Sequence, residues 1–208
     1  MARYRGPVCK LCRREGRKLF LKGDKCLSDK CPAEKRPFPP GEHGKRRTKE
    51  TGYLIQLREK QKAKRSYGLL ENQFKNYYSR AAKRKGITGE ILLQLLERRL
   101  DNVVYRSGFA LSRSEARQMV RHGHFAVNSK PVDIASYEVR EGDIVAVNPA
   151  SQEMARIKEN MESSSRAVVP SWLEVDQAKL SAKILRIPSR DEIDMPVQEQ
   201  LIIELYSR

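Results

Sequence analysis

The sequence predicts an α+β protein in which helices come first and a small mixed unit follows after about residue 95. Apolar residues recur at helical spacing between about residues 50 and 105, and short alternating apolar segments begin at about residue 125. The first 50 residues show neither period. A chain of 208 residues is long enough for one large domain or two small ones.

The N-terminal segment, residues 1–48, is predicted to be a basic arm without a core of its own. Gly, Pro, Lys and Arg dominate it, and residues 36–44 (Arg-Pro-Phe-Pro-Pro-Gly-Glu-His-Gly) are dense in turn formers. Such a segment buries too little apolar surface to offset the entropy lost when it is ordered. It therefore needs a staple or a partner to become ordered.

All four cysteines of the chain fall in this arm, at Cys9, Cys12, Cys26 and Cys31. Two close pairs on a short spacer give four thiolates that can converge on Zn²⁺, and we expect a structural zinc site. A four-cysteine iron–sulfur cluster would use the same ligands, so the sequence leaves the metal open. Two disulfides are a third alternative, which cytosolic proteins rarely contain. In either metal-bound form, the metal ties down a segment that lacks a core.

Residues 49–95 are predicted to form a helical domain. Three helices are indicated by apolar stripes, which comprise Tyr53, Leu54 and Leu57, then Phe74, Tyr77, Tyr78 and Ala81, then Ile91, Leu92, Leu95, Leu96 and Leu100. The second helix is followed by the basic run Lys83–Lys85, and Gly86 is the expected C-cap. Thr88 is the expected cap of the third helix.

A further helix is predicted to begin at Ser112, because Ser112 and Glu115 have the spacing of a capping box. Arg113, Arg117 and Arg121 recur at every fourth position and should share one face. The opposite, buried face is expected to contain Ala116, Met119 and Val120. Hydroxyl groups and free backbone N–H groups at the start of this helix add donors where the helix dipole attracts an anion. The arginine face is therefore a candidate surface for phosphate, although a solvated arginine stripe would give the same spacing.

The remaining elements are short. Strands are predicted around Phe125–Val127 and at Ile144–Val147, and a further one should follow a turn at Asn128-Ser129. Two more strands are predicted around Trp172–Val175 and around Leu180–Ile187. Between them, Met154, Ile157 and Met161 indicate a helix, and the apolar residues 201–206 indicate a short terminal element.

The charge is distributed unevenly along the chain. The net charge is +16, and the first 100 residues carry 28 basic and 10 acidic side chains. A field of this kind favours a polyphosphate partner through counterion release. A solubilising surface is the alternative, but solubility does not require this asymmetry. No stretch reaches the roughly 20 apolar residues of a membrane span, and the basic N-terminus has no apolar segment behind it, so we expect an intracellular, soluble protein.

Several segments resemble one family. Residues 99–147 resemble the small RNA-binding domain named after the fourth small-subunit ribosomal protein, and residues 1–7, the four cysteines, residues 36–44 and residues 199–208 resemble bacterial or organellar members of that protein's own family. The resemblance covers nearly the whole chain. It implies a helical first domain, 49–95, completed by 195–208, and an inserted domain, 96–194, that holds the RNA-binding module (the αL motif) at about 98–160. The presence of all four cysteines points to a metal-bound subgroup.

The resemblance also implies a function. Members of the family are structural proteins of the small ribosomal subunit that bind 16S rRNA directly, nucleate assembly of the 5′ domain and contribute to translational accuracy. Their partners are 16S rRNA, neighbouring small-subunit proteins, notably the fifth, and in several members their own mRNA; neither a membrane nor a small-molecule substrate is expected. The ribosome of the cytoplasm, or that of an organelle, is the expected location. The residues that we expect to contact RNA are Arg3, Arg5, Arg13, Arg14, Arg46, Arg47, Lys83, Arg84, Lys85, Arg99, Ser112, Arg113, Ser114, Arg117, Gln118, Arg121, His122 and Lys130.

An RNA-modifying enzyme with the same module is the alternative function. The sequence Arg99-Leu100-Asp101 is similar to the motif that carries the nucleophilic Asp of pseudouridine synthases. Such an enzyme needs a separate catalytic domain, which this chain has little room for after the module. We therefore expect no catalytic residue, and Asp101 is expected to be part of the binding module.

Overall fold

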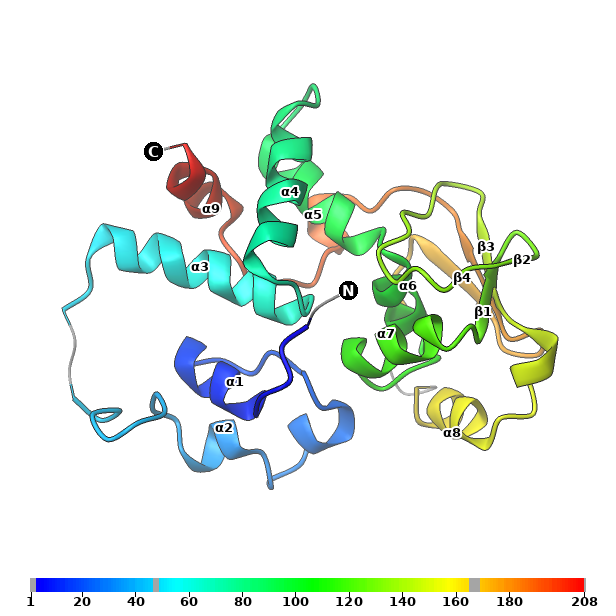
Figure 1. Ribbon diagram of the computed structural model, residues 1–208, viewed down its shortest axis with the longest axis horizontal. Coiled ribbons are helices and arrows are strands. Elements are labelled where there is room, and N and C mark those ends of the chain that lie inside the picture. Colours follow the sequence, from blue (N-terminus) through cyan, green and yellow to red (C-terminus); the bar gives the residue numbers. More distant parts are fainter. Residues whose placement is uncertain (1–2, 47–48, 165–168, 208) are drawn as a thin grey trace. The chain divides into compact units, whose positions relative to one another are not determined.

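The computed structural model describes residues 3–46, 49–164 and 169–207. Contacts divide the chain into a helical unit, Met1–Leu92 with Met195–Arg208, and a mixed unit, Leu93–Asp194. Figure 1 shows helices alone in the first unit and helices with strands in the second. The predicted α+β class is therefore confirmed.

The helical unit gathers segments from both ends of the chain. Its elements are α1 (Cys9–Glu15), η1 (Gly23–Cys26), α2 (Pro32–Lys35), α3 (Gly52–Ser66), α4 (Glu71–Ala82), α9 (Glu199–Tyr206) and the first residues of α5 (Thr88–Glu97), a helix that continues into the mixed unit. The C-terminal helix α9 packs against α3, and α1 contacts both α2 and α3 (Figure 1). On α9, Tyr206 stacks on Tyr78 of α4 with ring centroids 4.5 Å apart.

The buried side of α3 differs from the prediction. Tyr53, expected on the apolar stripe, is 55% exposed, and the helix instead buries a largely polar side that includes Gln56, Glu59 and Lys60. The reason is that α9 and the residues before it supply partners. Gln56 Nε2 donates to Glu204 Oε2 at 2.9 Å, and Glu59 accepts a hydrogen bond from the backbone N–H of Gln198 at 3.1 Å.

The third predicted helix is two helices. α5 ends at Glu97, and Leu100 begins α6 (Leu100–Arg106). The break occurs because Arg99 is extended and forms a bridge with Glu138, so the backbone N–H of Leu100 bonds the Tyr137 carbonyl at 2.8 Å. The predicted caps also shift: Thr88 is the first residue of α5 rather than its cap, and α4 ends at Ala82, before the basic run and Gly86.

The mixed unit places helices on a five-stranded antiparallel sheet. Its helices are α6, α7 (Arg113–Arg121) and α8 (Ala155–Ser164), with short 3₁₀ turns η2 (Pro149–Ser151) and η3 (Arg190–Glu192). The strands are β1 (Phe125–Val127), β2 (Lys130–Pro131), β3 (Ile144–Val147), β4 (Leu173–Asp176) and β5 (Ser181–Ile184), in the order β2-β1-β3-β5-β4. The turn between β1 and β2 has positive φ at Asn128 and Ser129, 49° and 65°, as a tight hairpin turn requires.

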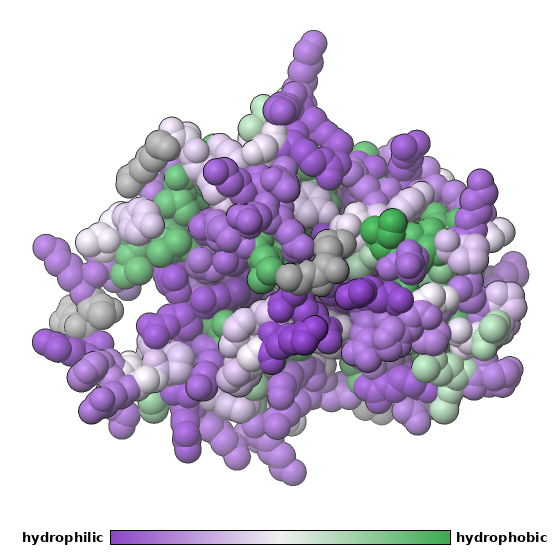
Figure 2. Space-filling model, in the orientation of Figure 1, coloured by the Kyte–Doolittle hydropathy of each residue, from purple (hydrophilic) through white to green (hydrophobic). Residues whose placement is uncertain are grey.

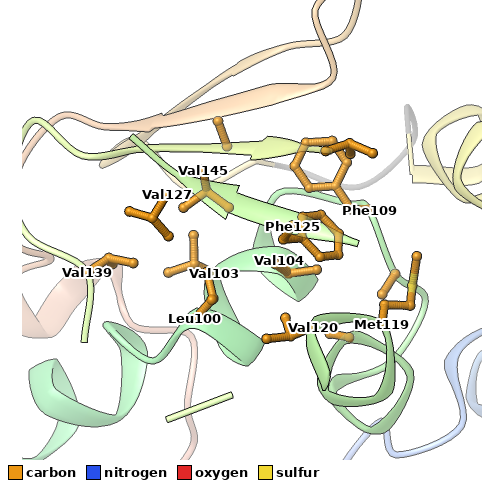
Figure 3. Close-up of a cluster of buried hydrophobic side chains, with 14 of the residues drawn as sticks. Leu100, Val103, Val104, Phe109, Met119, Val120, Phe125, Val127, Val139 and Val145 are labelled. Carbon is orange, nitrogen blue, oxygen red and sulfur yellow. The ribbon is translucent and has the colours of Figure 1, made fainter. Parts of the chain in front are cut away.

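The core of this unit lies between the sheet and the helices. Figure 3 shows Leu100, Val103 and Val104 of α6 beneath Val127 and Val145 of the sheet. Val120 of α7, predicted to be buried, is fully buried there, as is Ala116, and Met119 is 6% exposed. Ile157 of α8 joins the same cluster.

Within the described residues, no helix is long and apolar enough to cross a membrane.

Candidate nucleic-acid interface and cysteine cluster

The predicted cap of α7 is present. Ser112 Oγ accepts a hydrogen bond from the backbone N–H of Glu115 at 3.3 Å. The Glu115 carboxylate reaches back one residue further than a capping box does, and accepts from the N–H of Leu111 at 2.9 Å. Ser112 is buried, whereas Ser114 is exposed. The hydroxyl oxygens of the two serines lie 3.1 Å apart. Of these two hydroxyl groups, Ser114 is the one at the surface.

Two predicted RNA contacts, Arg99 and Arg117, lie in the interior instead. Arg99 is 2% exposed and holds the Asp101 carboxylate with Nε and Nη2, at 3.0 and 2.7 Å. Arg117 is 4% exposed, with Nη1 at 3.6 Å from Asp101 Oδ2. This corrects the expectation that Arg117 would share an exposed face with Arg113 and Arg121, and Arg99, which we expected to contact RNA, is buried as well. A buried carboxylate needs charged partners, and the two arginines supply them.

The exposed side of α7 is therefore rotated from the one that the arginine spacing predicted. Gln118, Arg121 and His122 are exposed, and Arg113 is half-buried. Lys130 on β2 is also exposed. The three arginines thus have three environments: Arg121 at the surface, Arg113 at its edge and Arg117 inside.

Most of the basic residues that we expected to contact RNA from the helical unit are at the surface. Arg3, Arg5, Arg46 and the run Lys83–Lys85 are exposed. Arg47, also predicted to contact RNA, lies outside the described residues. The visible face in Figure 2 is mostly hydrophilic, in keeping with this distribution.

Two arginines of α1 bind backbone carbonyls within the arm. Arg13 Nε donates to the carbonyls of Arg36 and Phe38 at 3.1 and 3.0 Å, and its guanidinium lies over the Phe38 ring. Arg14 Nη2 donates to the Pro40 carbonyl at 3.3 Å and is exposed. These contacts hold the Pro-rich turn segment against α1, which the sequence did not predict.

Glu15 connects the arm to α3. Its side chain is fully buried and pairs with Arg58, at 3.1 Å, and with Arg65. Burial raises the pKa of this carboxyl group, and the charges of Arg58 and Arg65 oppose that rise. The arm is therefore fixed to α3 by an ion-pair cluster that does not involve the cysteines.

The four cysteines line one small cavity. Cys9 and Cys12 lie on α1, Cys26 ends η1, and Cys31 directly precedes α2; all four are free thiols. Leu21 also lines the cavity. Burial raises the pKa of the Cys12 and Cys26 thiols, and the other thiols of the cluster raise it further. The Lys22 backbone N–H, 3.3 Å from Cys26 Sγ, favours the thiolate.

The cavity has the donor chemistry of a soft-metal site, because four sulfur atoms surround it. Within the described residues, no group of three or more His, Cys, Asp or Glu side chains is placed so that it could hold a metal ion. The structure thus brings the four predicted ligands to one place without setting their coordination geometry.

Three residues of the α7 environment were missed by sequence reasoning: Glu97, Asn102 and Tyr105. Glu97 is fully buried and Asn102 is 1% exposed, and both belong to one hydrogen-bonded cluster. A signal was available for Glu97, which lies at core spacing between Leu93 and Leu100. A carboxylate at such a position implies a buried polar cluster.

The chain consists of a helical unit and a mixed unit, and both expose basic side chains. A family model described as "Ribosomal protein S4/S9 N-terminal domain" matches residues 3–97, and one described as "S4 domain" matches residues 98–145. The chain is 64% identical to the small ribosomal subunit protein uS4A of Symbiobacterium thermophilum, over the full length of both. It is 58% identical to the uS4 proteins of Natranaerobius thermophilus and Dictyoglomus turgidum, again over both full lengths. The chain belongs to this S4 family of small ribosomal subunit proteins.

Proposed function

We propose that the chain is a structural protein of the small ribosomal subunit that binds 16S rRNA directly. Full-length identity with relatives named for that subunit supports the class of protein. The observation that carries the RNA-binding role is that each unit exposes cations: Lys83–Lys85 in the helical unit, and Arg121 and Lys130 in the mixed unit. Exposed cations bind phosphates by releasing condensed counterions.

In this proposal the chain works by geometry and charge. Its cationic surfaces hold phosphates of several RNA helices at fixed positions, which lowers the repulsion between them. Through this role it would nucleate the 5′ domain, contact neighbouring proteins such as the fifth of the small subunit, and contribute to accuracy; it would also bind its own messenger. The site of action would be the cytoplasmic ribosome.

The alternative of an RNA-modifying enzyme is not favoured. Asp101, the residue that would act as nucleophile, is 4% exposed and is held by two hydrogen bonds from Arg99. A carboxylate that is buried and already paired within its own module does not face a substrate.

The proposal is tested by charge reversal at two matched pairs of exposed lysines. Lys83→Glu with Lys85→Glu changes the basic run, and Lys179→Glu with Lys183→Glu changes the β4–β5 hairpin. We expect the first pair to weaken 16S rRNA binding at least about tenfold and to reduce the slope of log K against log salt by about 2, with little effect of the second. Equal losses, or a wild-type chain that does not prefer 16S rRNA over tRNA, would contradict the proposal.

We also propose that Cys9, Cys12, Cys26 and Cys31 hold a structural Zn²⁺. When bound, the ion would close the thiol cluster as four protein ligands around one metal. Metal analysis of the purified chain should find one zinc per chain, which Cys26→Ser loses. Iron with sulfide would indicate a cluster instead, and a metal-free wild-type chain would contradict both forms.

A further inference from the structure

Arg113 of α7 is held by two side chains of the preceding helix, α6. Its Nε donates to Oδ1 of Asn102 at 2.7 Å. Its guanidinium carbon lies 4.6 Å from the centroid of the Tyr105 ring. A guanidinium group that is bonded at one edge and stacked on one face has a fixed plane.

Asn102 is itself fixed by a buried acid. Its Nδ2 donates to the backbone carbonyl and to Oε2 of Glu97, at 2.9 and 2.7 Å. Arg106 holds the same carboxylate through Nε and Nη2, at 3.1 and 3.0 Å. Because the Asn102 amide nitrogen is committed to Glu97, its oxygen must face Arg113. The orientation of Arg113 is therefore determined by a chain of contacts that begins at a fully buried residue.

This arrangement ends at the surface. Glu97 and Asn102 are buried, Tyr105 is half-buried, and Arg113 is half-buried at the start of α7, beside the exposed Ser114. An arginine that is ordered before binding loses less conformational freedom when it bonds a phosphate, so it binds more tightly. Planar recognition also requires the guanidinium plane to be correctly set.

We propose that Asn102 and Tyr105 are positioning residues that hold the Arg113 guanidinium ready for an RNA phosphate; this inference rests on the proposed function. They act through Arg113 and need not touch RNA themselves. If their role were only to stabilise the fold, their substitution would weaken RNA binding whether or not Arg113 were present.

A double-mutant cycle with the full chain and 16S rRNA tests this. Tyr105→Leu should weaken binding about three- to tenfold, the factor expected when one side chain must be ordered on binding. In an Arg113→Ala background the same substitution should change binding by less than about twofold. Tyr105→Phe is the matched control, because it keeps the ring, and should bind like the wild type.

The outcomes separate the two proposals. Equal losses from Tyr105→Leu in both backgrounds, with normal wild-type binding, would overturn the positioning role alone. A wild-type chain that fails to bind 16S rRNA would overturn both. Arg113→Lys gives a second reading that does not depend on core packing, since it keeps the charge but removes the planar group. It should weaken binding by a similar three- to tenfold factor, and wild-type affinity would overturn the inference.

Discussion

Asp101→Asn removes the charge of a carboxylate that two buried arginines share. Asp101 is 4% exposed, accepts hydrogen bonds from Arg99 at 3.0 and 2.7 Å, and lies 3.6 Å from Arg117. The substitution keeps the size of the side chain but removes the negative charge that faces the two buried guanidinium groups. Removing one partner of a buried pair costs about 3 to 5 kcal/mol; because the amide still offers an acceptor oxygen, we expect the lower value, about 3 kcal/mol.

The assay uses the only tryptophan of the chain. Trp172 is 1% exposed in the core of the mixed unit, so its fluorescence reports the unfolding of that unit. For a unit of this size the urea dependence is about 1.3 kcal/mol per molar, so the midpoint should fall by about 2 M. Asp133→Asn, at an exposed position, is the control and should shift the midpoint by less than about 0.4 M. A midpoint for Asp101→Asn equal to that of the control would refute the structural role of the pair.

Three further predictions concern other parts of the fold. Burial would raise the pKa of Glu71, but hydrogen bonds from Lys60, Lys64 and Tyr206 lower this pKa to about 2. The ionised Glu71 carboxylate therefore contributes its full share of the folding stability above the unfolded pKa of 4.5, and this contribution is lost as pH falls towards 2. The melting temperatures of wild type and Glu71→Gln, followed by circular dichroism, should therefore converge between pH 4.5 and 2; a constant difference would contradict this. Ser129→Gly should stabilise the mixed unit by about 0.5 to 1 kcal/mol in urea unfolding, because Ser129 has a φ of 65° that glycine adopts without strain, and an unchanged midpoint would argue against strain there. Gly89→Ala should destabilise the helical unit by about 1 kcal/mol or more, although alanine has the better helix propensity, because the added Cβ would lie 2.5 Å from Glu199 Cγ on α9. We expect faster hydrogen exchange in α9, and slower exchange would contradict this prediction.

The arm shows how a segment without an apolar core can still be placed. Glu15 pairs with two arginines of α3, and Arg13 bonds two carbonyls of the Pro-rich segment. These contacts add to the cysteine cluster, so substitution of the cysteines should loosen the cavity region more than the end of α1. The prediction that the arm needs a staple was thus incomplete, because polar contacts between distant residues supply part of it.

The sequence alone determined the elements whose information is local. Residues Ser112 and Glu115 placed the start of α7 correctly. The alternation at Phe125–Val127 and the apolar run Ile144–Val147 placed two strands. Caps and short strand patterns can be recognised because they depend on neighbours in the chain. The cysteine spacing indicated that four thiols would gather, and they line one cavity.

Only the tertiary structure decided which charged residues face outward. Spacing put Arg113, Arg117 and Arg121 on one helix face, but it contained no information about what packs on that face. Asp101 draws Arg117 inside, while Asn102 and Tyr105 hold Arg113 at the surface edge. The polar contact side of α3 has the same origin, since its partner α9 comes from the other end of the chain. Burial of a charge depends on a compensating charge nearby in space, and periodicity along the chain does not reveal where that charge will be.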